Sequence, residues 1–416
     1  MTTRTSVAVI GAGVAGLAAS KELRAMGVDH VVLEAKPEVG GRAICDDAVF
    51  GFPYDLGAFW LGDDGDNLLI DVATELGFDV SDTSFPGPDV PMILGNNWET
   101  PAQKTERLAY VHAAMEAIHS YDASLPDRSI AEVAGTKSPW FPVFASWMGM
   151  LKGLPIEKIS VIDQATRHHR HSVHQVRGGM GTLIKAWAEP SEILLETPVK
   201  ALNWSPTGIE LDANGETVTA DAAILTASVG VLGSDTIRYG RPLPDDVRNS
   251  LDRMAMGNVN RIAVKFDGDV FGEGCPPMFG RYVTPDRYIY VMSRLVGQNV
   301  ALGYVGNDLA DALEHEPDDV AVALLTEALA IAIGLDVRER IIAVHCTRWR
   351  SDPWTLGAYA SVVPGAGNMR EALRKPWDGR VFVAGDASSP RHFNLVHGAA
   401  QEGIRAARAT ASLTGT

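Results

Sequence analysis

The chain has 416 residues, of which 46% are hydrophobic and 21% charged, an ordinary composition for a globular protein of two or three domains. Acidic residues outnumber basic ones by 52 to 36, and the net charge of -16 argues against a nucleic-acid or anionic-membrane partner. Three distant cysteines with no C-x-x-C pair support neither a disulfide framework nor a zinc site. Without a signal peptide or a long apolar run, we expect a cytoplasmic protein with no membrane segment. The oligomeric state, with a homodimer as one option, stays open.

The first 34 residues predict a strand, a helix and a second, parallel strand. The turn "GAGVAG" between the first strand and the helix has the spacing G-x-G-x-x-G. Gly11 permits the tight turn, Gly13 lets the backbone approach a pyrophosphate, and Gly16 allows close packing of helix and strand. Free N–H groups at the start of the helix, around Ala15, would hold phosphates.

An acidic residue and a second pair of glycines follow the second strand. Glu34 ends that strand and is followed by Ala35. The distance in sequence from the glycine turn to Glu34 is close to the ~20 residues expected for an acid that binds a ribose. In "EVGGRA", Gly41 and Arg42 supply another close backbone approach and a fixed cation for a diphosphate. NAD enzymes rarely need this second block, so the pattern favours FAD.

The remaining chain alternates between helical and strand-rich segments, which predicts an α/β protein. Helices are expected at 101–150, 317–335 and the C-terminus, and strands at 193–232 and 260–304. We predict a discontinuous nucleotide-binding domain over 1–75, 176–240 and 345–416. The second, substrate domain would be inserted over 76–175 and 241–344.

The stretch "GNVNRIAVKF" predicts a strand with two different faces, because alternate side chains point to opposite sides. One face looks like core and carries Ile262, Val264 and Phe266. The other face carries Ala263 between the cations Arg261 and Lys265. This second face points either to solvent or to a site that uses positive charge.

Eight blocks, in order along the chain, resemble the flavin-containing amine oxidase family, which includes monoamine oxidases, polyamine oxidases and flavin-dependent lysine demethylases. The blocks are "VAVIGAGVAGLAAS", "LEAKPEVGGRA", "DLGAFWLG", "VRGGMGTLIKAWA", "ETPVKAL", "ILTASVGVL", "WRSDPWTLGAYASVVPG" and "GRVFVAGDASSPRHFNLVHGAAQEGIRAA". The resemblance implies a Rossmann-like, glutathione-reductase-type FAD-binding domain with an inserted substrate domain of mixed sheet and helices. It also implies oxidation of a C–N bond in a small amine, with hydride transfer to flavin N5 and reoxidation by O2 to H2O2.

The resemblance further implies roles for individual residues. The flavin ring would be lined by Gly57, Ala58, Phe59 and Trp60. Other parts of FAD would be held by the backbone of Val199 at the adenine, by Gly385 and Asp386 at the ribityl chain or phosphate, and by the N–H of Val396 at the pyrimidine oxygen. The substrate would lie against Tyr359 and Trp349.

Three positions depart from the family pattern. Ala358 stands where monoamine oxidases carry the cysteine that bonds the flavin, so we expect non-covalent FAD. Leu395 replaces the second aromatic wall of the substrate cage, opposite Tyr359. Arg261 replaces a lysine that faces flavin N5. Because arginine keeps its proton, Arg261 would either attract superoxide and reduced flavin or grip a substrate carboxylate, as in an amino-acid oxidase.

Other interpretations stay open. A flavin-dependent desaturase or isomerase acting on C–C bonds of an apolar substrate shares the glycine turn, and a flavoprotein acting only as a binding partner is a third option. A histidine cluster is expected to be solvated or packed rather than to bind a metal, and comprises His168, His169, His171 and His174. Aromatic residues at near-helical spacing are expected to pack in the core rather than to form the wall of a substrate tunnel, and comprise Trp140, Phe141, Phe144 and Trp147.

Overall fold

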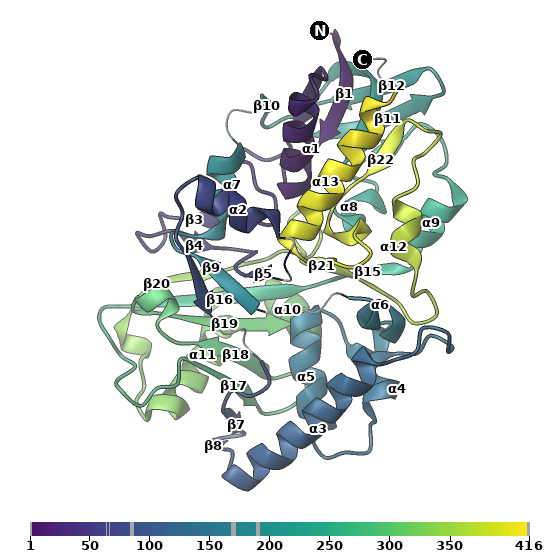
Figure 1. The fold of residues 1–416 in the computed structure, drawn as a ribbon. Coiled ribbons are helices and arrows are strands. Elements are labelled where there is room, and N and C mark those ends of the chain that lie inside the picture. Colours follow the sequence, from purple (N-terminus) through teal and green to yellow (C-terminus); the bar gives the residue numbers. More distant parts are fainter. Residues whose placement is uncertain are drawn as a thin grey trace.

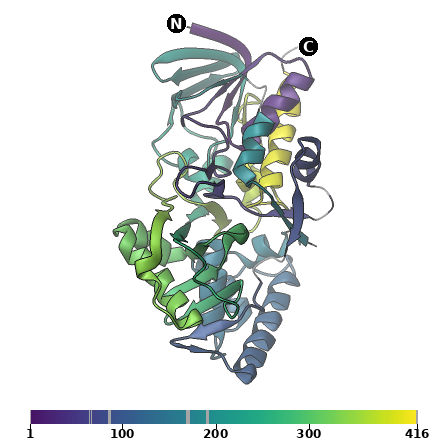
Figure 2. The ribbon, with the colours of Figure 1, turned by 90° about the vertical axis from the view of Figure 1, so that its left-hand side faces the viewer.

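Two β-sheets, each covered by helices, organise the protein (Figure 1). The computed structural model describes residues 2–63, 65, 67–83, 87–167, 172–188 and 192–413. The first sheet and its helices form the layer near both chain ends, and the second sheet forms the opposite layer (Figure 2).

The first sheet is eight-stranded in the described part of the chain, and its central strands are parallel. Its strands are β1 (Thr2–Ile10), β2 (His30–Leu33), β10 (Ile193–Leu194), β11 (Val199–Ser205), β12 (Gly208–Ala213), β13 (Glu216–Leu225), β14 (Arg238–Tyr239) and β22 (Val381–Val383). The order β10-β2-β1-β13-β12-β11-β14, with β22 beside β13, places the N-terminal strand β1 in the interior of the sheet. The second half of β1, residues 7–10, is therefore buried on both faces, which explains its apolar run.

Helices cover both faces of this sheet. One face packs against α1 (Val14–Ala25), α2 (Leu68–Glu75), α7 (Met180–Ala188) and α13 (Val396–Ala411). The other face packs against α8 (Val229–Leu232), α9 (Asp245–Asp252) and α12 (Met369–Leu373). α1 and α13 lie side by side (Figure 1), and a side chain at Gly403 of α13 would overlap the carbonyl oxygen of Ala15.

The second sheet has the strand order β20-β16-β19-β18-β17-β7-β8. Its strands are β7 (Met92–Leu94), β8 (Asn97–Trp98), β16 (Val259–Phe266), β17 (Met278–Tyr282), β18 (Tyr288–Met292), β19 (Val300–Gly306) and β20 (Ile341–Cys346). One face packs against α10 (Asn307–Glu314) and α11 (Asp318–Ile333). The other face packs against the helical segment α3 (Pro101–His119), α4 (Ile130–Ala134), α5 (Phe141–Lys152) and α6 (Val161–Ala165).

Short ribbons and turns connect the two layers. The ribbons are β3 (Cys45–Asp46) with β4 (Tyr54–Asp55), β15 (Met254–Gly257) with β21 (Tyr359–Val362), and β9 (Ser172–Val176) between β5 (Leu61–Asp63) and β6 (Val80–Thr83). The 3-10 turns are η1 (Ile156–Lys158), η2 (Leu295–Gly297), η3 (Arg338–Arg340) and η4 (Asp386–Ser388).

The predicted strand–helix–strand unit at the N-terminus is confirmed as β1, α1 and β2, with β1 and β2 parallel. The two faces of β16 are also as predicted, because Ile262, Val264 and Phe266 pack against α11 while Ala263 packs on the opposite side of the sheet. The proposed domain boundaries stay a prediction. Among the described residues, no helix combines the length and apolar character that crossing a membrane requires.

Candidate active site

A cavity of about 890 Å³ is lined by residues of both sheets. Its wall contains the predicted site residues Gly11, Gly13, Ala15, Glu34, Ala35, Gly41, Arg42, Gly57, Ala58, Phe59, Trp60, Val199, Arg261, Trp349, Tyr359, Gly385, Asp386 and Val396. Gly16 lies behind the wall, where an added side chain would overlap the carbonyl oxygen of Gly11. Residues that are far apart in the sequence are thus brought together, while their individual roles stay predictions.

The glycine turn forms one end of this cavity. An added Cβ at Gly13 would lie no closer than 3.9 Å to its neighbours, the nearest being Gly41 Cα, so the cavity side of the turn is open. The Glu34 carboxylate accepts hydrogen bonds from the backbone N–H groups of Ala12 at 2.6 Å and Lys36 at 2.8 Å. These two bonds fix the carboxylate beside the turn, where a ribose would need it.

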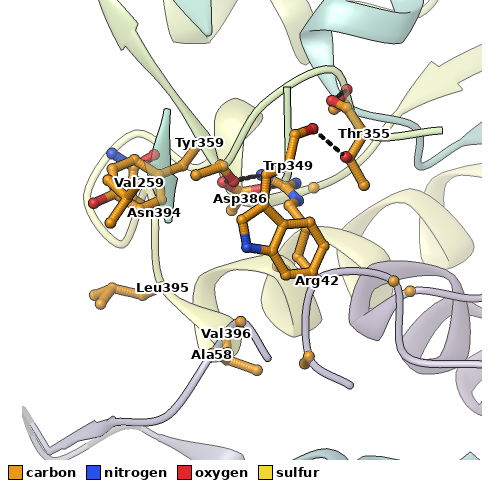
Figure 3. A pocket seen from close by; sticks show the side chains of 18 of the residues that line it. Arg42, Ala58, Val259, Trp349, Thr355, Tyr359, Asp386, Asn394, Leu395 and Val396 are labelled. Carbon is orange, nitrogen blue, oxygen red and sulfur yellow. Dashed lines mark hydrogen bonds and ion pairs between the residues drawn. The ribbon is translucent and has the colours of Figure 1, made fainter. Parts of the chain in front are cut away.

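Arg42 and Asp386, both predicted to contact the cofactor, form an ion pair with each other (Figure 3). Arg42 Nη2 donates to Asp386 Oδ1 at 2.6 Å, and Nη1 donates to the carbonyl oxygen of Ala358 at 2.6 Å. Arg42, which follows the second glycine pair, therefore connects this pair to the segment before β21 through Ala358 and to η4 through Asp386. Because Asp386 lies beside a cation, its negative charge is compensated where a diphosphate or ribityl chain would lie.

Arg261 is buried in the cavity wall and is only 5% exposed, so the solvent-facing alternative for this side chain is wrong. Its Nη1 and Nη2 groups donate to the backbone carbonyls of Asp55 and Gly57. The guanidinium carbon lies 5.5 Å from the centroid of the Phe59 ring and 5.3 Å from that of Tyr304. The arginine fork thus fixes the backbone of the block predicted to line the flavin ring.

This geometry bears on the two roles considered for Arg261. A bidentate grip on a substrate carboxylate would require both terminal nitrogens to leave the carbonyls to which they donate. The positive charge itself remains at the cavity. Lys265, the second cation of β16, donates from Nζ to the carbonyl oxygen of Phe50 at 2.6 Å and does not line the cavity.

Asp55 supports the same segment from behind the cavity wall. Burial raises the pKa of its carboxyl to about 6, although backbone N–H groups of Gly181 and Met180, each at 2.9 Å, and the charge of Arg261 oppose the rise. The carboxylate therefore ties the start of α7 to the segment that carries Gly57.

A buried carboxylate that the sequence analysis missed supports the segment after β20. Glu314 accepts hydrogen bonds from Asn258 and Asn260 at 2.7 Å each, from the backbone N–H groups of Arg350 and Ser351, and from Ser351 Oγ at 2.6 Å. Burial opposes its charge, yet the hydrogen bonds from Ser351, Asn260 and Asn258 outweigh burial, and the pKa of Glu314 lies below its usual value.

The amide of Asn260 extends this support to the cavity wall. Its Oδ1 accepts from the backbone N–H of Trp349 at 3.2 Å and from Thr347 Oγ1 at 3.1 Å. Thr347 Oγ1 in turn accepts from the backbone N–H of Arg261 at 2.8 Å. Trp349 and Arg261 are therefore connected through one polar network. The sequence did not indicate this network, because the asparagines and the glutamate that form it belong to no motif and have no characteristic spacing.

Tyr359 and the start of α13 form the part of the wall next to the second sheet and its helices. The Tyr359 hydroxyl donates to the carbonyl oxygen of Leu151 in α5, which holds the ring between the two layers. Figure 3 shows Leu395 and Val396 at the start of α13, with Asn394 just before them. Leu395, the position where the family places a second aromatic ring, does line the cavity.

The aromatic segment of α5 is partly core and partly cavity wall. Phe144 is fully buried and packs as predicted, whereas Trp147 both packs in the core and lines the cavity. Core packing is therefore confirmed for both residues, and Trp147 combines it with the alternative, a place in the cavity wall. Helical spacing identifies the buried face of a helix but does not tell a packed core from a cavity within it.

The histidine cluster is described only in part. His168, His169 and His171 lie outside the described residues, whereas His174 lies in β9, paired with Leu61 and Asp82. Within the ranges that the structure describes, no group of three or more His, Cys, Asp or Glu residues could hold a metal ion.

The residues present fit FAD. The wall offers an open backbone at Gly13, a cation at Arg42, and the N-termini of the two long helices α1 and α13. Free N–H groups at such helix ends stabilise phosphates and the negative charge of a reduced flavin. Gly57 must be glycine for the ring block to reach this position, because a side chain there would overlap the carbonyl oxygen of Arg42.

Comparison with known proteins gives consistent results. The profile of the family described as flavin containing amine oxidoreductase matches residues 14–411. Polyamine oxidase 4 of Oryza sativa is 27% identical over 442 residues, which cover 97% of this chain and 88% of that protein. Protein FLOWERING LOCUS D of Arabidopsis thaliana is 27% identical over 435 residues, which cover 97% of this chain and 55% of that protein. The chain thus spans only about half the length of this relative.

Solved structures show the same fold. Cyclohexylamine oxidase from Brevibacterium oxydans superposes with a TM-score of 0.81 at 21% identity, covering 98% of this chain and 99% of that one. Putrescine oxidase bound to putrescine gives a TM-score of 0.79, also at 21% identity and with the same coverage of each chain. The predicted FAD-binding fold is thereby confirmed, and membership of this flavin-containing family indicates FAD as the cofactor. The chain belongs to the flavin-containing amine oxidoreductase family.

Proposed function

We propose that the protein oxidises a C–N bond of a small amine, using FAD. The observation that carries this proposal is the continuity of the cavity. It begins at the glycine turn with Gly13, passes Arg42 and Trp349, and ends among the side chains of α3 and α5. A cofactor bound at the turn would place its ring beside Gly57 and Tyr359, where a substrate from the second layer meets it.

FAD, when bound, accepts a hydride from the carbon next to nitrogen and passes two electrons to O2 to give H2O2, while water hydrolyses the resulting imine. Glu34 would hold the ribose, the Gly13 turn the diphosphate, and Val199 the adenine. Arg42 would neutralise the phosphate region through its charge, in balance with Asp386.

The chain's own residues would orient the amine and exclude water. The Tyr359 ring, held by its hydroxyl on Leu151, presents one aromatic wall, and the apolar side chain of Leu395 lines the same cavity. Exclusion of water keeps the amine lone pair from being solvated and favours a reactive orientation. The N-terminus of α13 stabilises negative charge next to it.

The test is anaerobic mixing of the FAD-loaded protein with a panel of amines and amino acids, followed by absorbance of the flavin. Bleaching by an amine, then return of colour with production of H2O2 on admission of air, is the expected result. Bleaching by apolar polyenes instead of amines would contradict the proposal and favour the C–C desaturase alternative.

We also propose that FAD is held without a covalent bond, because Ala358 offers no thiol and its carbonyl oxygen serves Arg42. Precipitation of the purified protein with acid is expected to leave the yellow colour in the supernatant. Colour that remains with the precipitate would contradict this expectation. The cytoplasmic location and the homodimer considered from the sequence remain predictions.

A further inference from the structure

We infer that the substrate carries an oxygen acceptor, preferably a carboxylate, at the end remote from the reacting nitrogen, and that the site disfavours a second ammonium group there. This inference rests on the proposed amine oxidation and narrows its substrate class.

The first observation concerns the acidic residues of the cavity. Among the described residues of the wall, only Glu34 and Asp386 are acidic. Glu34 accepts from the glycine turn at Ala12, and Asp386 forms its ion pair with Arg42. Both carboxylates belong to the part of the wall formed by the first sheet, where FAD fits. The substrate side of the cavity, formed by the second sheet and its helices, therefore offers no carboxylate for a second ammonium among its described residues.

The second observation concerns two buried donors on the substrate side. Trp147 Nε1 and Tyr290 Oη belong to cavity-lining residues that are 7% and 1% exposed, and neither atom has a hydrogen-bond partner among the described residues. Both side chains pack in the cluster between α5 and the second sheet. An indole N–H only donates, and a phenol donates as readily as it accepts. A buried donor without a partner is costly, so this wall favours a ligand that accepts hydrogen bonds.

The third observation is the charge of the same wall. Lys152, at the end of α5, lines the cavity and donates from Nζ to the amide oxygen of Gln164. Arg167 lines the cavity as well. Positive side chains on this wall attract a carboxylate and repel an ammonium. Charge and hydrogen-bonding capacity thus favour the same ligand.

The direct test uses amines that differ only at the remote end. The FAD-loaded protein is mixed anaerobically with δ-aminovalerate, aminopentanol, n-pentylamine or cadaverine, and with the shorter pair γ-aminobutyrate and putrescine. We expect the apparent second-order rate of flavin bleaching to be at least tenfold higher for each amino acid than for the diamine of equal length. Equal or faster bleaching by the diamines or by n-pentylamine would overturn the inference while the proposed function stands. Bleaching by none of a broad amine panel would overturn both.

Variants that remove one donor each test which side chains carry the preference. Tyr290→Phe and Trp147→Phe each remove an unpartnered donor, and we expect either to reduce the preference for the amino acid about tenfold. Tyr54→Phe is the matched control, because its hydroxyl is equally buried and unpartnered among the described residues but does not line the cavity. The same variants are titrated with n-valerate, which lacks the amine, using the shift of the flavin spectrum. Unchanged preference and unchanged valerate affinity in both donor variants, with normal flavin content, would overturn the inference.

Discussion

Arg261 performs two tasks with one side chain. Its fork donates to the carbonyls of Asp55 and Gly57, while its charge stays beside the cavity. A lysine, the family residue at this position, carries the charge but lacks the planar fork. Substitution therefore separates the two contributions.

We expect Arg261→Met to slow both bleaching and reoxidation about tenfold or more, because the ring block loses its anchor and the site loses a cation. Arg261→Lys should recover the rate of reoxidation, which depends on charge, but only partly recover flavin content, which depends on the fork. Stopped-flow measurement of the two half-reactions, with the flavin-to-protein ratio, checks this. Full recovery of flavin content by lysine would contradict the anchoring role.

The glycine turn yields a prediction in which folding and cofactor binding separate. Gly13→Ala is expected to leave the fold intact, since the added Cβ meets nothing within 3.9 Å, yet to lower flavin content strongly. Gly16→Ala should destabilise the fold itself, because its Cβ would overlap the carbonyl oxygen of Gly11.

The control for the glycine variants is Gly27→Ala, at the end of α1. Its φ of +71° makes alanine cost about 1–2 kcal/mol, with open space around the Cβ and no contact with the cavity. This variant should unfold somewhat earlier in denaturant and keep its flavin. Full flavin content in Gly13→Ala would contradict the assignment of the turn.

At the scale of elements, α10 contributes more to the site than its sequence indicates. Its last residue, Glu314, receives hydrogen bonds from β16 and from the segment after β20. We expect Glu314→Gln to lower the free energy of unfolding by about 2–3 kcal/mol, because an amide accepts fewer hydrogen bonds and adds a donor facing donors. Denaturant unfolding checks this value, with Glu316→Gln, at an exposed position just beyond the helix, as the control.

The pH dependence of this contribution has a definite sign. Because the folded pKa of Glu314 lies below its ordinary value of 4.5, its stabilisation is present above that pH and is lost as the pH falls through the folded pKa. The difference in stability between the parent and Glu314→Gln should therefore shrink in acid. A difference in stability that stays constant from neutral pH down to pH values below 4.5 would show that the charge of Glu314 does not hold the segment after β20.

The elements that the sequence predicted best are those with local signals. The glycine turn specifies β1, α1 and β2, because spacing and backbone freedom act within one short stretch. Alternation in β16 identified its two faces correctly. Other contacts join residues far apart in the chain. Examples are the hydrogen bonds of Glu314 and the buried ion pair between Asp163 and Arg370 at 2.7 Å. No local pattern marks such partners, and the cavity beside Trp147 likewise arises only when α5 packs against the second sheet.

At the scale of the whole molecule, net charge and site charge have opposite signs. The chain carries -16, yet the substrate side of the cavity has Lys152, Arg167 and Arg261 on its wall. Taken alone, the total charge would favour the approach of a cationic ligand. Local side chains act at short range, whereas salt screens the rest of the surface beyond about 10 Å. The charge at the site is therefore the better guide to the substrate.

The path of the chain between the two layers limits how the protein can move. In the described part of the chain, the backbone passes between the sheets four times, from β2 to β7, β8 to β10, β14 to β16 and β20 to β22. The last two passages are joined by the hydrogen bonds of β15 with β21. Domain closure about a hinge concentrates rotation in a few residues of the connecting segments, and here four connections, two of them paired, would have to rotate together.

Ligands must then reach the cavity by local rearrangement of side chains and short segments, with the two layers staying in place. We expect small-angle X-ray scattering to give the same radius of gyration for the FAD-loaded protein with and without a saturating amine under anaerobic conditions. A measurable contraction would reveal a closing motion and contradict this view. With a rigid frame, the rate of substrate capture would be set by how readily the side chains around the cavity move apart, and bulkier residues placed in its wall would slow binding without altering the chemical step.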